Sequence, residues 1–225
     1  MTRLYLVRHC EARGNADRVF QGSTDAEISE RGALQLERLR ERFAAVTLDV
    51  LYSSPLRRAQ ATAQAINHQG LPVIIDQGLV EINGGHWEGV KWSEFPVRYP
   101  DEAHDWNLAP WNFAPVNGEP MRHVYDRISR TITAIVQREQ GKIIGIVSHG
   151  CAIRNYLCFA HGWPIERLND VDWADNTGVC VIDYDDTLHP QIIMENDNTH
   201  LTQELSTFAT QEWWRKRNRE DMKFD

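Results

Sequence analysis

Two short polar motifs follow apolar runs in this chain, and their side chains are suited to binding and attacking an anion. Arg8-His9-Cys10 comes directly after the apolar run 4–7, and Ser148-His149-Gly150 comes directly after a second run at 143–147. Open α/β sheets bind their ligands at the carboxyl ends of parallel strands. We therefore predict that Arg8, His9 and His149 lie in one pocket that binds an anion.

The elements that would position these motifs alternate between strand and helix. Apolar runs at 4–7, 50–52, 73–75 and 143–147 predict strands, while helical spacing of apolar residues predicts helices that include 36–46, 59–66 and 124–135. A further helix is expected at 151–161, followed by an antiparallel hairpin at 179–184 and 191–194. The pattern predicts one domain over 1–225, of the α/β class, a three-layer α/β/α sandwich with a mostly parallel central sheet.

The regular alternation stops between Ile82 and Pro120, where tryptophans and prolines are frequent. We expect a small lid or inserted subdomain with short helices at about 82–120. Its tryptophans would either shape an apolar substrate pocket or pack the lid against the core, and the sequence leaves both open. The tail at 211–225 is expected to form a terminal helix docked by Trp213 and Trp214.

Charge and composition exclude several classes of partner. The net charge of −8 argues against broad nucleic-acid binding, which needs a basic face. No apolar run approaches the roughly 20 residues that cross a bilayer, and the N-terminus has no signal-peptide pattern. Four cysteines without a CxxC pair favour a reduced, cytoplasmic setting. The histidines lack metal-ligand spacing, so we expect neither a metal nor another cofactor; a homodimer stays open.

Four blocks of residues, in order along the chain, are similar to the histidine phosphatase superfamily, the phosphoglycerate mutase-like group. The first block runs from Leu4 through Arg8-His9-Cys10 to Asn15, Gln21-Gly22 and Gly32. The other three are at 53–63, 81–89 and 147–150, and they include Arg58, Glu81 and His149. Any one block alone would be weak evidence, whereas four in the expected order are specific.

The resemblance implies a role for each matched residue. His9 would accept the phosphoryl group on an imidazole nitrogen, and Arg8, Arg58 and His149 would bind the phosphate oxygens. Glu81 would protonate the leaving oxygen and then act as base toward water. Further phosphate- or substrate-binding positions would be Asn15, Gln21, Gly22 and Gly150.

Elementary chemistry is consistent with this set. Phosphoryl transfer depends mainly on positioning and on charge stabilisation, and arginine supplies planar paired donors for phosphate. Nearby arginines disfavour the protonated imidazole, so the nucleophile stays neutral near pH 7. Because the arginines oppose the phosphate charge, the reaction is expected to need no metal.

Alternatives remain at three points of the predicted site. Glu11 and Glu88 compete with Glu81 for the acid role. Cys10 stands where the family signature has glycine, which can be needed for a special backbone angle or a close approach to ligand. Cys151 follows the second motif in the same way, so both thiols are expected near the pocket.

The resemblance does not decide whether the phosphoryl group is transferred to water or to a second substrate. The runs at 81–89 and 118–120 resemble the phosphatase branch, and the stretch 82–122 contains only Lys91, Arg98 and Arg122 as cations, few for a bisphosphate. These features favour a phosphomonoesterase that acts on a small phosphorylated metabolite. The alternatives are mutase-type phosphoryl transfer and a non-catalytic phosphate-binding protein.

Overall fold

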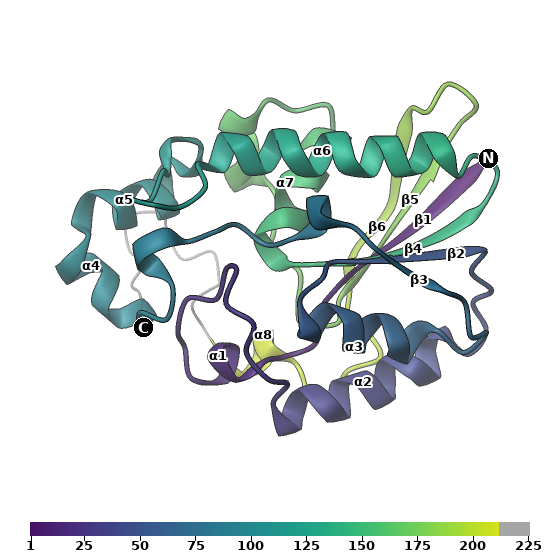
Figure 1. Cartoon of the computed structure of the whole chain (residues 1–225), viewed down its shortest axis with the longest axis horizontal. Coiled ribbons are helices and arrows are strands. Elements are labelled where there is room, and N and C mark those ends of the chain that lie inside the picture. Colours follow the sequence, from purple (N-terminus) through teal and green to yellow (C-terminus); the bar gives the residue numbers. More distant parts are fainter. Residues whose placement is uncertain (212–225) are drawn as a thin grey trace.

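The computed structural model describes residues 1–211 and contains a six-stranded sheet with helices on both faces (Figure 1). The order across the sheet is β3-β2-β4-β1-β5-β6. The strands are β1 (Thr2–Arg8), β2 (Val50–Ser53), β3 (Val73–Ile75), β4 (Ile143–Ser148), β5 (Val179–Tyr184) and β6 (Pro190–Asp197). The first four are parallel to one another, and β5 and β6 add an antiparallel hairpin at one edge. The predicted three-layer, mostly parallel architecture is confirmed.

Helices of very different length surround the sheet. The longer ones are α2 (Glu30–Phe43), α3 (Arg57–Ile66), α6 (Met121–Arg138) and α7 (Gly150–Ala160), and the shorter ones are α1 (Arg13–Ala16), α4 (Phe95–Arg98), α5 (Pro100–Leu108) and α8 (Thr207–Thr210). Helices α6 and α7 lie on one face, while α2 and α3 lie on the other (Figure 1). Apart from Gln211, the expected helix at 211–225, with Trp213 and Trp214, falls outside the described residues.

The side chains of β1 alternate between the two faces of the sheet and pack against the helices on both faces. Leu4 and Leu6 belong to the larger hydrophobic cluster, which contains the buried residues of α6 and α7. Val7 belongs to the other cluster, with Leu39 of α2 and Ala63 of α3. Because successive side chains of a strand point to opposite faces, one apolar run anchors both helical layers. Burial on both faces explains why this central parallel strand is nearly all apolar.

Strand register brings the two histidine motifs together. Arg8 at the end of β1 is paired with Ser148 at the end of β4, and the main-chain nitrogen of His9 donates to the carbonyl of Ser148 over 3.0 Å. The end of β2 is adjacent, because Ser53 pairs with Val147. The carboxyl ends of three neighbouring parallel strands therefore meet at one place.

The segment at 82–120 packs into the main core. Trp87 is fully buried and stacks on Phe95 with a centroid separation of 3.7 Å, and both belong to the cluster that contains Leu4 of β1. Helices α4 and α5 lie beyond the carboxyl ends of the parallel strands, at the left of Figure 1. This segment is thus continuous with the core of the domain.

No helix within residues 1–211 has the length and apolarity needed to cross a bilayer. All four cysteines lie in this part of the chain, and each is buried with a free thiol.

Candidate active site

A narrow cavity of about 60 Å³ lies at the carboxyl ends of β1 and β4. Its size is that of a few water molecules, so it suits a small group. The predicted site residues that line it are Arg8, His9, Asn15, Gln21, Glu81 and Gly150. Arg58, His149 and Gly22 are buried nearby but are not part of the lining.

His9 is buried and held in one tautomer. Its Nδ1 lies 2.6 Å from the carbonyl oxygen of Cys10. A carbonyl oxygen can only accept, so Nδ1 carries the proton and Nε2 of the neutral ring carries the lone pair. Burial, together with the charges of Arg58 and Arg8, holds the pKa of His9 well below its usual value. The ring is therefore neutral and nucleophilic at physiological pH.

Two arginines lie near His9, and each guanidinium group forms hydrogen bonds through only some of its nitrogens. Arg8 is nearly fully buried and donates from Nη1 to the carbonyl of Ala174 over 2.6 Å. Arg58 is fully buried at the start of α3 and donates to the carbonyls of Thr24 and Gly22 over 2.7 and 2.8 Å. The neighbouring Arg57 is largely exposed and forms an ion pair with Asp25.

His149 lies beside His9 at the start of α7. The two imidazole centroids are 5.0 Å apart, and Nε2 of His149 is 2.7 Å from the hydroxyl of Ser54. Burial and the charge of Arg58 hold the pKa of His149 well below its usual value. Both imidazoles of the site are therefore neutral.

Unsatisfied polar nitrogens gather around His9. Among the described residues, five buried side-chain polar atoms have no hydrogen-bond partner, and three of them are Nε of Arg8, Nε of Arg58 and Nδ1 of His149. A buried polar atom without a partner costs about 1–3 kcal/mol, so such atoms are uncommon unless they serve a function. Three of them beside one imidazole fit a site that binds an anion.

The three candidate acids differ in their surroundings. Glu81 lines the cavity, and its two oxygens accept main-chain N–H groups of Ile82, Cys151 and Ala152 over 3.0 Å each. Burial nonetheless raises the pKa of Glu81 above its usual value. A carboxyl group that faces the cavity and has a raised pKa is suited to donate a proton.

Glu11 and Glu88 have structural contacts instead. Glu11 is buried, forms an ion pair with Arg31 and accepts a hydrogen bond from Ser29. Glu88 accepts main-chain N–H groups from 22–24 and from Gly84. Burial opposes ionisation of Glu88, but these bonds and the Thr24 hydroxyl hold its pKa below its usual value. Neither carboxylate lines the cavity.

Gly22 and Gly150 occupy positions where a side chain would be too close to another group, but the neighbouring group differs. A Cβ on Gly22 would lie 2.0 Å from the carbonyl oxygen of Ile82, so Gly22 allows two loops to pack closely. A Cβ on Gly150 would lie 3.2 Å from Nε of Arg8, so Gly150 leaves room for that guanidinium. Both glycines also contact predicted phosphate-binding residues, because the carbonyl of Gly22 accepts a hydrogen bond from Arg58.

The two thiols expected near the pocket are separated. Cys151 lines the cavity, but Cys10 does not, and its thiol faces the carbonyl of Arg58 at 3.9 Å. Cys10 adjoins His9, but its side chain points toward α3 and into the protein. Cys10 is also absent from the residues with positive φ, so its position does not require the backbone freedom of glycine.

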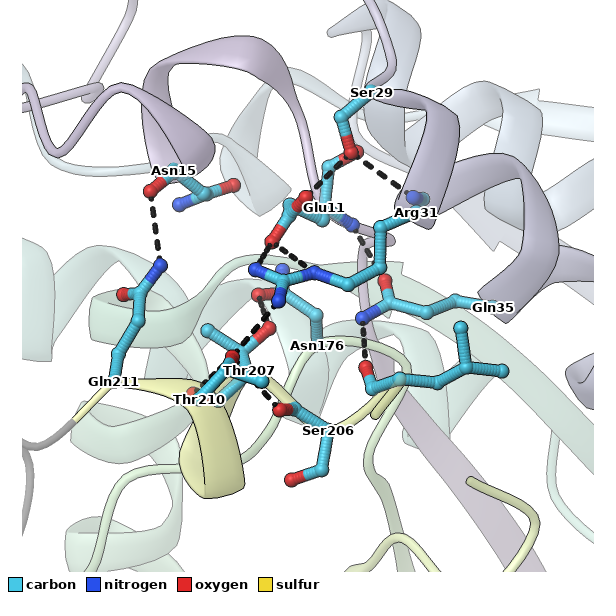
Figure 2. A network of polar contacts seen from close by, with 12 residues as sticks. Glu11, Asn15, Ser29, Arg31, Gln35, Asn176, Ser206, Thr207, Thr210 and Gln211 are labelled. Carbon is cyan, nitrogen blue, oxygen red and sulfur yellow. Dashed lines mark hydrogen bonds and ion pairs between the residues drawn. The ribbon is translucent and has the colours of Figure 1, made fainter. Parts of the chain in front are cut away.

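The segment 205–211, here called the C-terminal strap, contributes to the cavity lining, and Figure 2 shows its polar contacts with other parts of the chain. Thr207 and Gln211 line the cavity, and Gln211 donates from Nε2 to the carbonyl of Asn15 over 3.2 Å. The strap is held by buried polar contacts: Gln35 donates to the carbonyl of Leu205 over 2.8 Å. Sequence reasoning missed this wall, because nearly 200 residues separate it from the histidine motif.

The fully buried carboxylate of Asp175 ties the strap to the turn that precedes β5. It accepts hydrogen bonds from the Ser206 hydroxyl at 2.6 Å, the Thr207 main chain at 3.0 Å and the Asn198 amide at 3.0 Å. Within the turn at 176–178, the side-chain amide of Asn176 donates a hydrogen bond to the main-chain carbonyl of His9.

Aromatic side chains form the apolar part of the lining. Trp92 and Trp106 line the cavity, whereas Trp87 is buried in the core, so both interpretations of the tryptophans hold for different members. Trp173 also lines the cavity, and Arg154 stacks on its ring at 4.7 Å. Arg154 thus supports a wall and does not itself line the cavity. Trp173 and Arg18 carried no pattern in the sequence that marked them.

Comparisons with known proteins identify the family of the chain. The model of the histidine phosphatase superfamily (branch 1) matches residues 4–198. Phosphoserine phosphatase 1 of Hydrogenobacter thermophilus is 32% identical over 186 residues, which cover 81% of this chain and 86% of that protein. The adenosylcobalamin/alpha-ribazole phosphatase of Escherichia coli is 29% identical over 171 residues, covering 74% and 82% of the two chains.

Solved structures show the same fold. YhfR of Bacillus stearothermophilus superposes with a TM-score of 0.84 at 31% identity, over 89% of this chain and 99% of that one. A phosphoserine phosphatase variant of Entamoeba histolytica in complex with phosphoserine gives a TM-score of 0.80 at 25% identity, over 90% and 100% of the chains. With its paired histidine motifs at adjacent strand ends, the chain belongs to the histidine phosphatase superfamily, branch 1.

Proposed function

We propose that the protein is a metal-independent phosphomonoesterase that hydrolyses a small phosphorylated metabolite through a phosphohistidine on His9. The observation that carries this proposal is the group of unsatisfied buried nitrogens of Arg8, Arg58 and His149 around a neutral imidazole. Phosphate oxygens are acceptors that would satisfy these nitrogens. The names of relatives, which include phosphoserine and alpha-ribazole phosphatases, support hydrolysis of a phosphate ester.

In the first step, Nε2 of His9 attacks phosphorus while the ester P–O bond breaks. The two arginines stabilise the charge on the equatorial oxygens. Protonated Glu81 gives its proton to the departing oxygen, so the alcohol leaves neutral. The products of this step are the alcohol, phosphorylated His9 and ionised Glu81.

The second step returns the enzyme to its starting state. Glu81 accepts a proton from water, the water oxygen bonds to phosphorus, and the P–N bond breaks. Inorganic phosphate leaves, and His9 regains its lone pair on Nε2. The hydrogen bond from Nδ1 to Cys10 persists through both steps and keeps the ring oriented.

His149 would contribute a donor to the phosphate. The main-chain N–H of Leu56 donates to the Ser54 hydroxyl over 3.4 Å, which leaves the hydroxyl proton free to be donated to Nε2 of His149. The neutral ring would then carry its own proton on Nδ1, the atom that has no partner among the described residues. The Nδ1–H group of neutral His149 would donate a hydrogen bond to a phosphate oxygen while the ring stays neutral.

The test is hydrolysis of p-nitrophenyl phosphate by the full-length protein, with acid-stable and acid-labile phosphate separated after quenching. We expect activity without added metal, unchanged by EDTA, together with an acid-labile phosphohistidine. Both should disappear in His9→Ala. Hydrolysis that persists in His9→Ala would contradict the proposal.

The same experiment addresses the two alternatives. Conversion of 3-phosphoglycerate stimulated by 2,3-bisphosphoglycerate, and faster than its hydrolysis, would show a mutase. Phosphate binding without turnover of any ester would show a binding protein. The relatives described as probable phosphoglycerate mutases, at 27–28% identity, make the first control necessary.

A further inference from the structure

Arg18 is an exposed arginine that lines the catalytic cavity in an uncommon backbone conformation. Its φ is +55°, in the left-handed region that non-glycine residues seldom adopt. The conformation is fixed by main-chain bonds: the nitrogen of Arg18 donates to Asn15 over 3.3 Å, and its carbonyl accepts from Trp92 over 3.0 Å. Left-handed non-glycine residues persist only where the surroundings determine them, and they concentrate at functional sites.

The adjoining main chain is tied down on both sides of Arg18. Val19 donates to the carbonyl of Gly14 over 2.9 Å and forms an isolated antiparallel bridge with Lys91. Phe20 donates to Val90 over 2.9 Å, and its ring packs among buried aromatic residues. The base of the Arg18 side chain is therefore held in place at the mouth of the cavity.

The cavity lining contains more cationic than anionic side chains. Within the described chain, Arg8 and Arg18 are the cations that line it, and Glu81 is the carboxylate. Both oxygens of Glu81 are occupied by main-chain N–H groups, and Arg8 is buried beside His9. Within residues 1–211, the guanidinium of Arg18 forms no hydrogen bond or ion pair.

We propose, on the basis of the phosphatase function proposed above, that Arg18 binds a second anionic group of the substrate, a carboxylate close to the phosphate ester. The phosphate would occupy the inner end, at Arg8 and His9, and the carboxylate would face Arg18 at the mouth. The planar guanidinium can donate two parallel hydrogen bonds to a carboxylate. Arg8, His9 and Arg18 line the same cavity, so the carbon skeleton between the two anions would lie within it.

This assignment makes Arg18 a residue that determines specificity without taking part in the chemistry. The ester phosphate and His9 are at the inner end, so removing the Arg18 charge leaves the reacting atoms unchanged. An exposed guanidinium is partly screened by salt. The preference for the carboxylate should therefore be about tenfold at low ionic strength and should shrink as salt is added.

The experiment compares 3-phosphoglycerate with glycerol 3-phosphate, which have the same skeleton but carry a carboxylate and a hydroxymethyl group respectively. We expect wild-type protein to have a kcat/KM about tenfold higher for the first ester, mainly through a lower KM. In Arg18→Met the two values should converge, because kcat/KM for 3-phosphoglycerate falls toward the value for glycerol 3-phosphate. Arg18→Lys should keep part of the preference, because the charge remains.

A matched control lies five residues earlier, at the start of α1. Arg13 is exposed, forms a distant ion pair with Glu27 at 3.8 Å and does not line the cavity. Arg13→Met removes the same charge from the same surface and should keep the wild-type preference. Equal kcat/KM for the two esters in wild-type protein would contradict the proposal, as would an equal loss of preference in both variants.

Binding separates this proposal from the proposed phosphatase function. Calorimetric titration of His9→Ala with each ester measures the preference without turnover. Tighter binding of 3-phosphoglycerate that is lost on adding Arg18→Met supports the role of Arg18, even if wild-type protein hydrolyses neither ester. Equal affinity for the two esters would overturn it, whatever the activity.

Discussion

The side-chain amide of Asn176 donates a hydrogen bond to the main-chain carbonyl of His9 over 3.0 Å. The orientation of that amide is fixed in turn, because the hydroxyl of Thr207 donates to its Oδ1 over 2.8 Å. Thr207 is buried and lies on the C-terminal strap. Two hydrogen bonds therefore connect the end of the described chain to the main chain of the proposed nucleophile, as Figure 2 shows in part.

Removing this connection should slow turnover with little change in substrate binding. Thr207→Val deletes the donor at similar volume, and we expect kcat to fall by about tenfold for every ester, since small displacements of a nucleophile are costly. Thr207→Ser keeps the hydroxyl and should restore most of kcat. Steady-state kinetics together with the melting temperature of each variant provide the measurement.

Thr210 supplies the control for this series. It lies on the same short helix, and its hydroxyl contacts Arg31 and the carbonyl of Ser206. It does not line the cavity. Thr210→Val should therefore lower the melting temperature to a similar extent and leave kcat near the wild-type value. Equal kcat losses in the two valine variants would show that the strap acts only through stability.

Replacing the acid should affect esters according to their leaving groups. In Glu81→Gln we expect kcat for an alkyl phosphate to fall by about 10²–10⁴-fold, because no proton is available for the alkoxide. p-Nitrophenolate is a stable anion, so formation of the phosphohistidine from p-nitrophenyl phosphate should change far less. A rapid-quench measurement of both esters tests this, and equal losses would argue against Glu81 as the acid.

The pH profile for an alkyl phosphate follows from the same two groups. His9 must be neutral to attack, and its pKa is well below the usual value, so activity should fall only at acid pH. Glu81 must be protonated, and burial raises its pKa, so activity should fall again as the pH rises through that pKa. The alkaline limb should be absent in Glu81→Gln, which can be read from kcat/KM between pH 4 and 9.

Filling the space at Gly150 should disturb Arg8. The added Cβ of Gly150→Ala would lie 3.2 Å from Nε of Arg8, which is closer than ordinary contact. Alanine is the better helix former by up to about 1 kcal/mol, so the melting temperature should stay the same or rise. The inhibition constant of phosphate should nevertheless increase several-fold. A variant that binds phosphate normally would show that Arg8 can shift without loss.

His200 should make the folded protein sensitive to acid. Burial and then the charge of Arg42 lower the pKa of His200 to about 4, and its Nε2 is 3.0 Å from the Thr177 hydroxyl. Because the unfolded chain has the higher pKa, it binds more protons between about pH 6.5 and 4, so the free energy of unfolding falls as pH falls through this window. Protonation would also place a charge against Arg42.

The measurement is urea unfolding at several pH values between 4 and 7. In His200→Gln the loss of unfolding free energy across this window should be smaller than in wild-type protein. His189→Gln, at an exposed histidine of the β5–β6 hairpin, should follow the wild-type curve. Parallel curves for wild-type protein and His200→Gln would contradict the assignment.

The sheet and the inner part of the site could be predicted because local signals determine them. Apolar runs mark strands that are buried on both faces, and Arg8, His9 and His149 stand directly after such runs. Because these strands pair in parallel, their carboxyl ends meet, and the three side chains come together. The family resemblance added Arg58 and Glu81, which no spacing rule would have joined to the histidines.

The outer part of the site depends on contacts that a sequence does not display. Arg18 has a role only because a loop holds it in a left-handed conformation, and Thr207 faces the cavity only because Asp175 fixes the strap. The side chain of Cys10 could not be placed either, because its direction depends on how α3 packs against the end of β1. These relationships arise from tertiary packing between segments far apart in the chain.

The cavity wall supplied by Thr207 and Gln211 has a consequence for biosynthesis. A ribosome that has completed β1 through β6 has already made every residue proposed to bind or attack phosphate. The wall is added among the last residues of the described chain, and until then Asp175 lacks its contacts with 206 and 207. A nascent chain should therefore acquire its fold before it acquires turnover, and premature termination near residue 205 should yield folded but poorly active protein.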